Sequence, residues 1–205
     1  MSVLDLRNIL IEPDSAISDI VSNVGMNVSP FTGAIQTVEM VGAKWKLSFS
    51  YQSLSLEHGR AFKTLKAQMR SGARLCVVPD MSYVPRSLQV GGTPVISGAN
   101  QAGSSLKIEG MFPNSRIFEI GDQLSYLATD GLYHMHIVTS ASDSDGSGIV
   151  YAQIEPPLRN PPLDGGSVEL VKPCISALLT GGGEVSTQGV LISCSLEFTE
   201  ALYGF

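Results

Sequence analysis

The chain has 205 residues, of which 43% are hydrophobic, and a formal net charge of -6 at pH 7. This length allows one or two domains with a hydrophobic core, and the hydrophobic content excludes a disordered chain. No apolar run approaches the roughly 20 residues that span a bilayer, and the N-terminus lacks the basic-then-apolar order of an export signal. We therefore expect a globular protein that is synthesised in the cytoplasm and not inserted in a membrane.

The negative charge is concentrated in the middle of the chain. Residues 87–170 hold three basic side chains, Lys107, Arg116 and Arg159, against nine acidic ones, a balance of -6. The rest of the chain holds ten basic and ten acidic side chains and is neutral. The average field of the middle segment repels nucleic acid.

The three cysteines predict free thiols. Cys76, Cys174 and Cys194 are an odd number at wide spacing, which fits neither a disulfide framework nor a metal cage. Cys76 and Cys194 lie in apolar, strand-like runs, so we expect both to be buried.

The first 51 residues predict strands. Residues 1–33 are interpreted as an edge strand, or an arm toward a neighbouring subunit, followed by a long connection that ends in a turn at 27–33. Residues 34–41 and 44–51 predict a hairpin with its turn at Gly42-Ala43. In the second strand large residues alternate with polar ones, which is typical of a half-buried strand. The face expected to be buried comprises Trp45, Leu47, Phe49 and Tyr51.

Residues 55–71 predict the one helix. Ser55 is a suitable N-cap, and Glu57 lies in the first turn, where the helix dipole favours an anion. Phe62, Leu65 and Met69 recur at three- and four-residue spacing and form an apolar stripe that packs on the sheet. We expect Gly72 to end the helix and another strand to begin near residue 75.

Basic residues are densest on this helix, namely Arg60, Lys63, Lys66, Arg70 and, just beyond it, Arg74. The simplest interpretation is a solvated helix face. A contact with an acidic neighbouring subunit is the second, and DNA contact is the third because no aromatic residues are interleaved for stacking.

The middle of the chain predicts a small barrel. Residues 80–104 are rich in Gly, Pro and Ser and are interpreted as a linker or surface loop that contains a domain boundary. Five short strands follow in about 65 residues without a helix, which is typical of a small antiparallel barrel. Their turns fall at Gly121-Asp122, at 143–148 and at 160–166.

Residues 171–205 return to the character of the first part. Strands at 176–180 and 190–198 flank Gly181–Glu184, a predicted hairpin turn, and are expected to pair with the central sheet. One face of the second strand comprises Val190, Ile192, Cys194, Leu196 and Phe198. The predicted fold is mainly β. Residues 1–86 and 171–205 form a β-sandwich-like domain with the helix 55–71, and residues 87–170 form an inserted, OB-like antiparallel barrel.

A metal or catalytic site has little support in the sequence. His134 and His136 point to one side of a strand, and a third ligand would come from His58 or a carboxylate, as a metal-dependent hydrolase would require. The simpler interpretation is an exposed strand face with two polar residues.

Residues 143–148 resemble a calcium loop only briefly, because Ala141 and Ala152 stand where the EF-hand pattern needs oxygen ligands. A polar turn is the simpler interpretation. Gly181–Glu184 lacks the Lys and Ser/Thr of a phosphate loop. With no nucleophile elbow and no evident carboxylate pair, we predict no enzymatic activity and no catalytic, cofactor-binding or metal-binding residues.

Two runs together resemble a known family. The first is PFTGAIQTVEMVGAKWKLSFSYQSLSLEHGRAFKTLKAQMRSGA, and it is similar to the N-terminal region of minor tail proteins of long-tailed bacteriophages. The second is GDQLSYLATDGLYHMHIVTSASDSDGSGIVYAQIEPPLRNPPLDGGSVEL, which looks like the middle portion of the same proteins. The order of these motifs, over about two thirds of the chain, resembles the distal tail protein.

This resemblance implies a structural protein of the virion tail tip. Such proteins form a ring, usually a hexamer, that joins the tail tube to the hub and fibre proteins and leaves a lumen for DNA. Their first domain is related to tail-tube subunits, and many carry an inserted barrel. The partners implied are other copies of the chain and these tail proteins, with DNA only in transit through a lumen that we expect to be acidic.

The alternative is a module that binds a host-surface carbohydrate, with assembly secondary. Barrels of this size often bind sugars, and exposed aromatic side chains would favour such binding. The inserted segment offers Phe112, Phe118, Tyr126, Tyr133 and Tyr151. Most of these alternate with apolar residues, so we expect most of them in the core.

Overall fold

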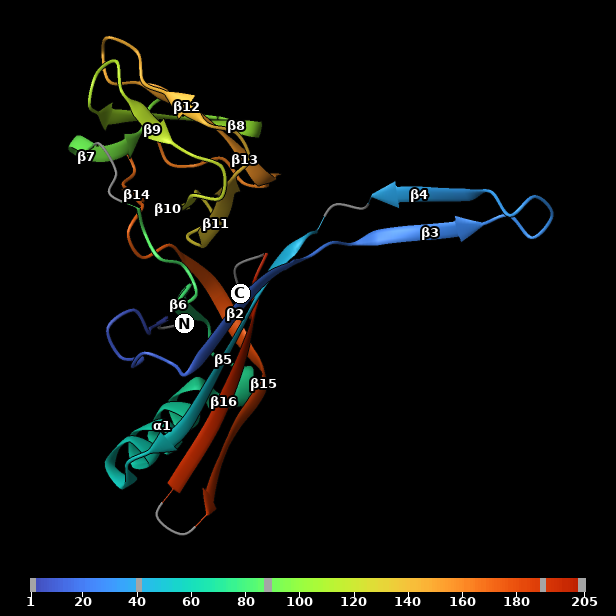
Figure 1. The fold of residues 1–205 in the computed structure, drawn as a ribbon, viewed down its shortest axis with the longest axis vertical. Helices are drawn as coiled ribbons and strands as arrows, with labels where there is room; N and C mark the ends of the chain where they lie inside the picture. Colours follow the sequence, from blue (N-terminus) through green and yellow to red (C-terminus); the bar gives the residue numbers. More distant parts are fainter. Residues whose placement is uncertain (1–2, 40–41, 87–89, 189–190, 203–205) are drawn as a thin grey trace.

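The computed structural model describes residues 3–39, 42–86, 90–188 and 191–202. These form two six-stranded sheets joined end to end, and two further pairs of strands (Figure 1). The first sheet has six strands in the order β1-β6-β15-β16-β5-β2. All neighbours run antiparallel except β1 and β6. Its strands are β1 (Leu4–Asp5), β2 (Ser15–Val21), β5 (Lys44–Leu54), β6 (Cys76–Pro79), β15 (Cys174–Gln188) and β16 (Leu191–Glu200).

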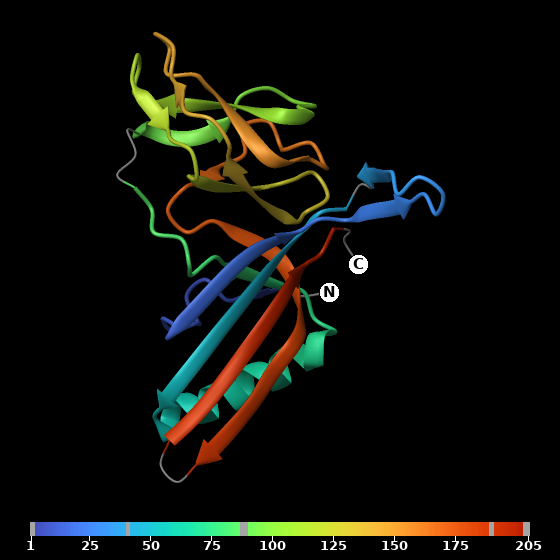
Figure 2. The ribbon, with the colours of Figure 1, turned by 45° about the vertical axis from the view of Figure 1, so that its right-hand side comes forward.

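Helix α1 (Leu56–Met69) covers one face of this sheet, over β15 and β16 (Figure 2). Ser55 caps it as predicted, because its side chain accepts a hydrogen bond from the His58 N–H. The predicted stripe of Phe62, Leu65 and Met69 is buried. The four large residues of β5 and the described members of the predicted β16 face are buried with it, whereas Val190 lies outside the described residues.

The helix ends earlier than predicted, at Met69, because Arg70 adopts the left-handed conformation. Gly72 lies in the 3-10 turn that follows, Arg70–Gly72, with φ +93°. A Cβ at Gly72 would lie 2.2 Å from the Leu179 carbonyl oxygen, so this position joins the end of the helix to β15.

We expect Gly72→Ala to lower the free energy of unfolding by about 3 kcal/mol or more, because it combines backbone strain with a backbone collision. Chemical denaturation would measure the loss. Gly33→Ala is the matched control: Gly33 also has a positive φ but has open space around it. It should cost only about 1 kcal/mol, the price of the left-handed conformation. Equal midpoints for the two variants would contradict the collision at Gly72.

Residues 90–169 form the second sheet, which is antiparallel, barrel-like and nearly closed, in the order β14-β10-β11-β13-β8-β7. A bridge between Val95 and Ser167 joins its two edges. Its strands are β7 (Val90–Ile96), β8 (Gly103–Met111), β10 (Gln123–Leu127), β11 (Tyr133–Val138), β13 (Val150–Leu158) and β14 (Val168–Glu169). The short strands β9 (Arg116–Phe118) and β12 (Ser142–Asp143) pair beside it.

Four details of the predicted strands are wrong. The connection within 1–33 contains β2, and it also contains β3 (Val24–Val28), which pairs with β4 (Ile35–Glu39). The predicted turn at Gly42-Ala43 therefore does not join two paired strands, because β5 pairs with β2 and β16. The loop predicted at 80–104 contains β7 and the start of β8, and residues 105–170 hold more than the five predicted strands. Gly181–Glu184 lies inside β15, where register shifts replace the expected turn.

Candidate functional site

Several exposed apolar side chains gather on the hairpin of β3 and β4, which leaves the first sheet and extends to one side of the molecule (Figures 1 and 2). Met26 lies opposite Thr37 and Val28 lies opposite Ile35, so these side chains share one face of the hairpin. Met26, Val28 and Ile35 are 60–65% exposed, and Phe31 near the tip is 96% exposed. We call Val24, Met26, Val28, Phe31 and Ile35 the apolar hairpin face.

A two-stranded hairpin alone is at best marginally stable in water, since it buries too little apolar surface. The apolar hairpin face is therefore better suited to a contact with another chain than to solvent. The alternation of Val24, Met26 and Val28 before the turn could have revealed β3 in the sequence.

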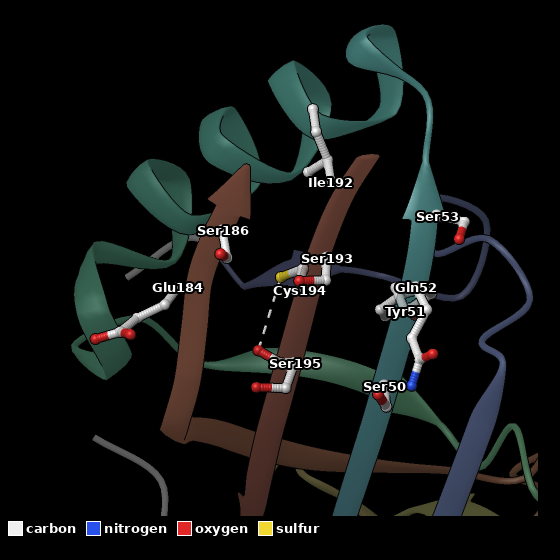
Figure 3. A pocket seen from close by; sticks show the side chains of 10 residues that line it. All are labelled: Ser50, Tyr51, Gln52, Ser53, Glu184, Ser186, Ile192, Ser193, Cys194 and Ser195. Carbon is white, nitrogen blue, oxygen red and sulfur yellow. Dashed lines mark hydrogen bonds between the residues drawn. The ribbon is translucent and has the colours of Figure 1, made fainter. Parts of the chain in front are cut away.

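The open face of the first sheet is polar and hollowed (Figure 3). The hollow, of about 530 Å³, crosses β5, β15 and β16. Its lining includes Ser50, Gln52, Ser53, Glu184, Ser186, Ser193 and Ser195, with Tyr51, Ile192 and Cys194 at its floor. Glu184 is the one charged residue of this lining, and no histidine or lysine accompanies the serines as a base.

The thiol at the floor of this hollow is poorly suited to act as a nucleophile. Cys194 is buried, and burial raises the pKa of its thiol. Its Sγ lies 3.7 Å from the Ser195 carbonyl oxygen (Figure 3). Cys76 and Cys174 are also free and buried, as predicted for Cys76 and Cys194. The hollow thus offers hydroxyl groups for contact and little for catalysis.

The two sheets meet at a buried polar junction around Glu200, the last residue of β16. Its Oε2 accepts hydrogen bonds from the Trp45 backbone N–H and from Arg159 Nη2, both at 3.0 Å. Its Oε1 lies 3.2 Å from His134 Nδ1. Burial opposes ionisation of Glu200, but these hydrogen bonds and the Arg159 charge outweigh it and lower the pKa of the carboxyl.

Further contacts at this junction are made by the backbone of β11. The Trp45 indole N–H donates to the Met135 carbonyl at 2.7 Å, and the Tyr133 N–H donates to Ser176 Oγ at 2.9 Å. Met135 also belongs to the hydrophobic core under the first sheet. β11 is therefore covered on both faces.

His134 and His136 lie on one side of β11 as predicted, but the expectation of an exposed strand face is wrong. Both are 1% exposed, because the barrel-like sheet closes around them. His136 Nδ1–H donates to the Pro156 carbonyl at 2.6 Å, which leaves Nε2 to accept from the Tyr126 hydroxyl at 3.2 Å. Burial is the main cause that lowers the pKa of His136 to about 3, so the ring is neutral.

The remaining predicted sites are not assembled into one place. Within the described ranges, no three His, Cys, Asp or Glu side chains are grouped to hold a metal ion. In residues 143–148, Asp145 accepts the N–H groups of Ser147 and Ile149, an arrangement typical of a polar turn. His58 lies on the exposed first turn of α1, far along the chain from β11.

The aromatic residues considered for sugar binding are dispersed. Phe118 and Tyr126 are buried, and Tyr133 packs under Arg7. Tyr151 is exposed and pairs with Lys107, five residues before the exposed Phe112, so about 16 Å of strand separates the two. They do not form one stacking platform.

The basic residues of α1 occupy one flank of the helix. Arg60, Lys63 and Arg70 are exposed, and the Lys66 stem packs beside Gly183. In the described part of the chain, no ion pair joins these four to a carboxylate. Arg74 Nη1 donates to the Gln68 carbonyl. The flank is solvated in the single chain.

Comparison of the sequence with known protein families and with curated proteins finds no match. In the residues that the structure describes, no helix is both long enough and apolar enough to cross a membrane. The hairpin, the hollow and the polar junction are therefore the features from which a function is argued.

Proposed function

We propose that this protein is a structural component of a bacteriophage tail tip, where copies of it form a ring, of six in the expected case. The ring would join the distal end of the tail tube to the hub and fibre proteins. The observation that carries the proposal is the apolar hairpin face, which projects from the first sheet with no cover from its own chain among the described residues.

A second copy is the partner that this hairpin suits best. A heterologous contact, in which one surface of a copy meets a different surface of the next, closes into a ring when the rotation permits. Besides the hairpin, β2 is an edge strand that pairs on one side alone among the described residues, and Ile17 and Val21 on that strand are exposed. A projecting arm and an open, partly apolar edge fit this mode of assembly.

We also propose that the first sheet is related to tail-tube subunits and to a β-sandwich, and that residues 87–170 form an inserted domain.

In a ring whose open sheet faces point inward, passing DNA would meet the hydroxyl-lined hollow. The charged residues along this face are Lys44, Lys46, Asp19, Glu197 and, in the hollow, Glu184. Two cations against three anions leave a charge of -1 for each copy, so the lumen would be weakly acidic.

We expect the purified protein to form rings with a central hole, measured by light scattering over a concentration range and by negative-stain images of the same peak. Met26→Lys with Val28→Lys should reduce it to a monomer with unchanged circular dichroism, because charge on the hairpin face opposes burial. Ile120→Lys, at an exposed apolar residue in the turn between β9 and β10, is the matched control and should keep the ring.

Rings of the same mass from the double variant would remove the hairpin from the interface. A parent protein that stays monomeric at every concentration and binds an immobilised glycan would instead favour the carbohydrate-binding module.

A further inference from the structure

We propose that the hairpin of β3 and β4 docks on one particular surface of a second copy of this chain, an apolar groove between β7 and β14 of the barrel-like sheet. The side chain of Phe31, at the tip of the hairpin, would fill this groove. The inference rests on the proposed function, because it names the surface that receives the hairpin when copies assemble.

The groove begins where the two edges of the barrel-like sheet separate. The antiparallel bridge between Val95 and Ser167 joins β7 to the strand that becomes β14. Continued by one step, this register would set Pro94 beside Val168, but proline has no N–H to donate to a neighbouring strand. The described residues accordingly show no further pairing between the two edges.

Beyond this point the structure has a groove of about 650 Å³ between the start of β7 and the residues that follow β14. Val168 and Leu170 are 6% and 4% exposed and form its floor, whereas Val171 at the rim is 59% exposed. Most of the lining is apolar and consists of Pro85, Val90, Pro94, Val168, Leu170 and Val171. A groove of this size can hold more than one aromatic ring.

The two charged residues of the lining have partners within their own chain. Arg86 Nη2 lies 2.7 Å from Asp122 Oδ2. Glu169 Oε1 accepts the N–H groups of Val171 and Lys172 at 2.9 and 3.0 Å. Neither side chain depends on a charged partner from outside, so the groove suits an uncharged, apolar occupant.

The hairpin has the matching polarity, and its tip is ordered. Residues 24–38 contain no charged side chain. The turn that presents Phe31 is hydrogen-bonded: the Gly33 N–H donates to the Ser29 carbonyl, and the Ser29 N–H donates to the Ala34 carbonyl, both at 2.9 Å. An aromatic side chain on an ordered turn loses little conformational entropy when it docks.

Two other hollows in the described part of the chain are less suitable for Phe31. The hollow on the open face of the first sheet is lined mainly by hydroxyl groups and contains Glu184. Another, of about 600 Å³ at the base of the hairpin, is lined by Lys44, Lys46 and Glu197 among others. An aromatic ring in either hollow would remove water from polar groups without replacing its hydrogen bonds.

The positions of hairpin and groove suit assembly from copy to copy. In Figure 1 the hairpin extends to the right, whereas β7 and β14 lie at the left of the barrel-like sheet, and the turned view of Figure 2 keeps them on opposite sides. A contact between opposite sides of identical copies is heterologous. It repeats from one copy to the next and closes into a ring when the rotation permits.

The available area is close to what a stable contact needs. An aromatic side chain buries about 150–250 Å², and each smaller apolar side chain adds on the order of 100 Å². The apolar hairpin face therefore offers about 600 Å², against about 800 Å² on each partner of a standard interface. In a closed ring each copy would make one such contact by its hairpin and one by its groove.

The test places a charge at the groove rim of the full chain. Because Val171 is more than half exposed, Val171→Lys should leave the circular dichroism unchanged. We expect it to raise the concentration at which half of the chains are assembled about tenfold or more, measured by light scattering, since the charge would be buried by docking.

Tyr151→Lys is the matched control. Tyr151 is 56% exposed and lies on β13, an inner strand of the barrel-like sheet, so this variant should assemble as the parent protein does. If Val171→Lys also forms rings at the concentration of the parent protein, the groove does not receive the hairpin, and the proposed ring remains.

Cross-linking separates a failure of this inference from a failure of the proposed function. Thr32→Cys places a thiol beside Phe31, and Lys172→Cys, in a second preparation, places one beside the groove. The native cysteines of the chain are buried. A mixture of the two preparations, treated with a short bifunctional maleimide, should give a dimer that neither gives alone, whereas Thr32→Cys mixed with Tyr151→Cys should not.

If the parent protein stays monomeric in light scattering but this cross-link forms, the contact between hairpin and groove is supported without the ring. If the cross-link forms no more readily than in the mixture with Tyr151→Cys, the contact is overturned, whatever the mass of the parent protein.

Discussion

We expect Glu200→Gln to lower the free energy of unfolding by about 3–5 kcal/mol. This is the range found when one partner of a buried ion pair is removed. The side chain of Glu200 is fully buried, and its carboxylate faces Arg159 and His134. Glutamine keeps the volume and an oxygen for the Trp45 N–H, so the variant isolates the loss of charge. Urea denaturation followed by Trp45 fluorescence and by circular dichroism measures both the loss and whether the two sheets still unfold together.

Glu197→Gln provides a control in the same strand. Glu197 pairs with Lys46 at 3.1 Å, but both side chains are more than 40% exposed. Exposed pairs are worth at most about 1 kcal/mol, because water and salt screen them. If the two variants lost equal stability, the junction would contribute no more than a surface ion pair.

Local patterns predicted the helix and the buried strand faces because each depends on residues close in sequence. The stripe of α1 and the period of two in β5 follow from helix and strand geometry alone. The pairing partners of these strands were harder to predict from the sequence, since β5 pairs with β16, whose residues lie about 150 positions away. A glycine near position 42 suggested a local turn, but the conformational freedom of glycine does not specify pairing.

The same limitation explains β15. Gly182 and Gly183 have positive φ, which is why their sequence resembles a turn. In the structure they accommodate bulges within a long strand, a use of glycine that only the partner strand defines. The loop predicted at 80–104 failed in a similar way, because Gly91 and Gly92 lie in β7.

The candidate site could be predicted only in part. Alternation placed His134 and His136 on one side of a strand, but their burial depends on the barrel-like sheet closing around that side of β11. Glu200 and Asp130 meet His134 from segments that no spacing rule connects. The strand that carries most of the apolar hairpin face could have been predicted, since its apolar residues alternate. Its exposure could not, because it follows from the hairpin leaving the sheet.

Acid should destabilise the protein before any carboxylate is protonated, because His136 is buried in the neutral form. Its pKa is about 3 in the folded chain, below the ordinary value of about 6.5 that it regains on unfolding. Between these values the unfolded state binds one more proton. The contribution of His136 to the unfolding free energy is therefore fully present above about pH 6.5. It falls by up to about 1.4 kcal/mol for each pH unit toward pH 3.

The window from pH 6.5 to 4.5 isolates this histidine. The pKa of Glu200 is also lowered by folding, so its contribution is lost in the same direction, but only below about pH 4.5, where the unfolded carboxyl begins to be protonated. His136→Gln should flatten the dependence of unfolding free energy on pH in this window, since glutamine can donate to Pro156 and accept from Tyr126 without titrating. His58→Gln, on the exposed turn of α1, should follow the parent protein. If the unfolding free energy of His136→Gln still falls between pH 6.5 and 4.5, another buried group takes up the proton. The neutral His136 would then not explain the loss of stability in acid.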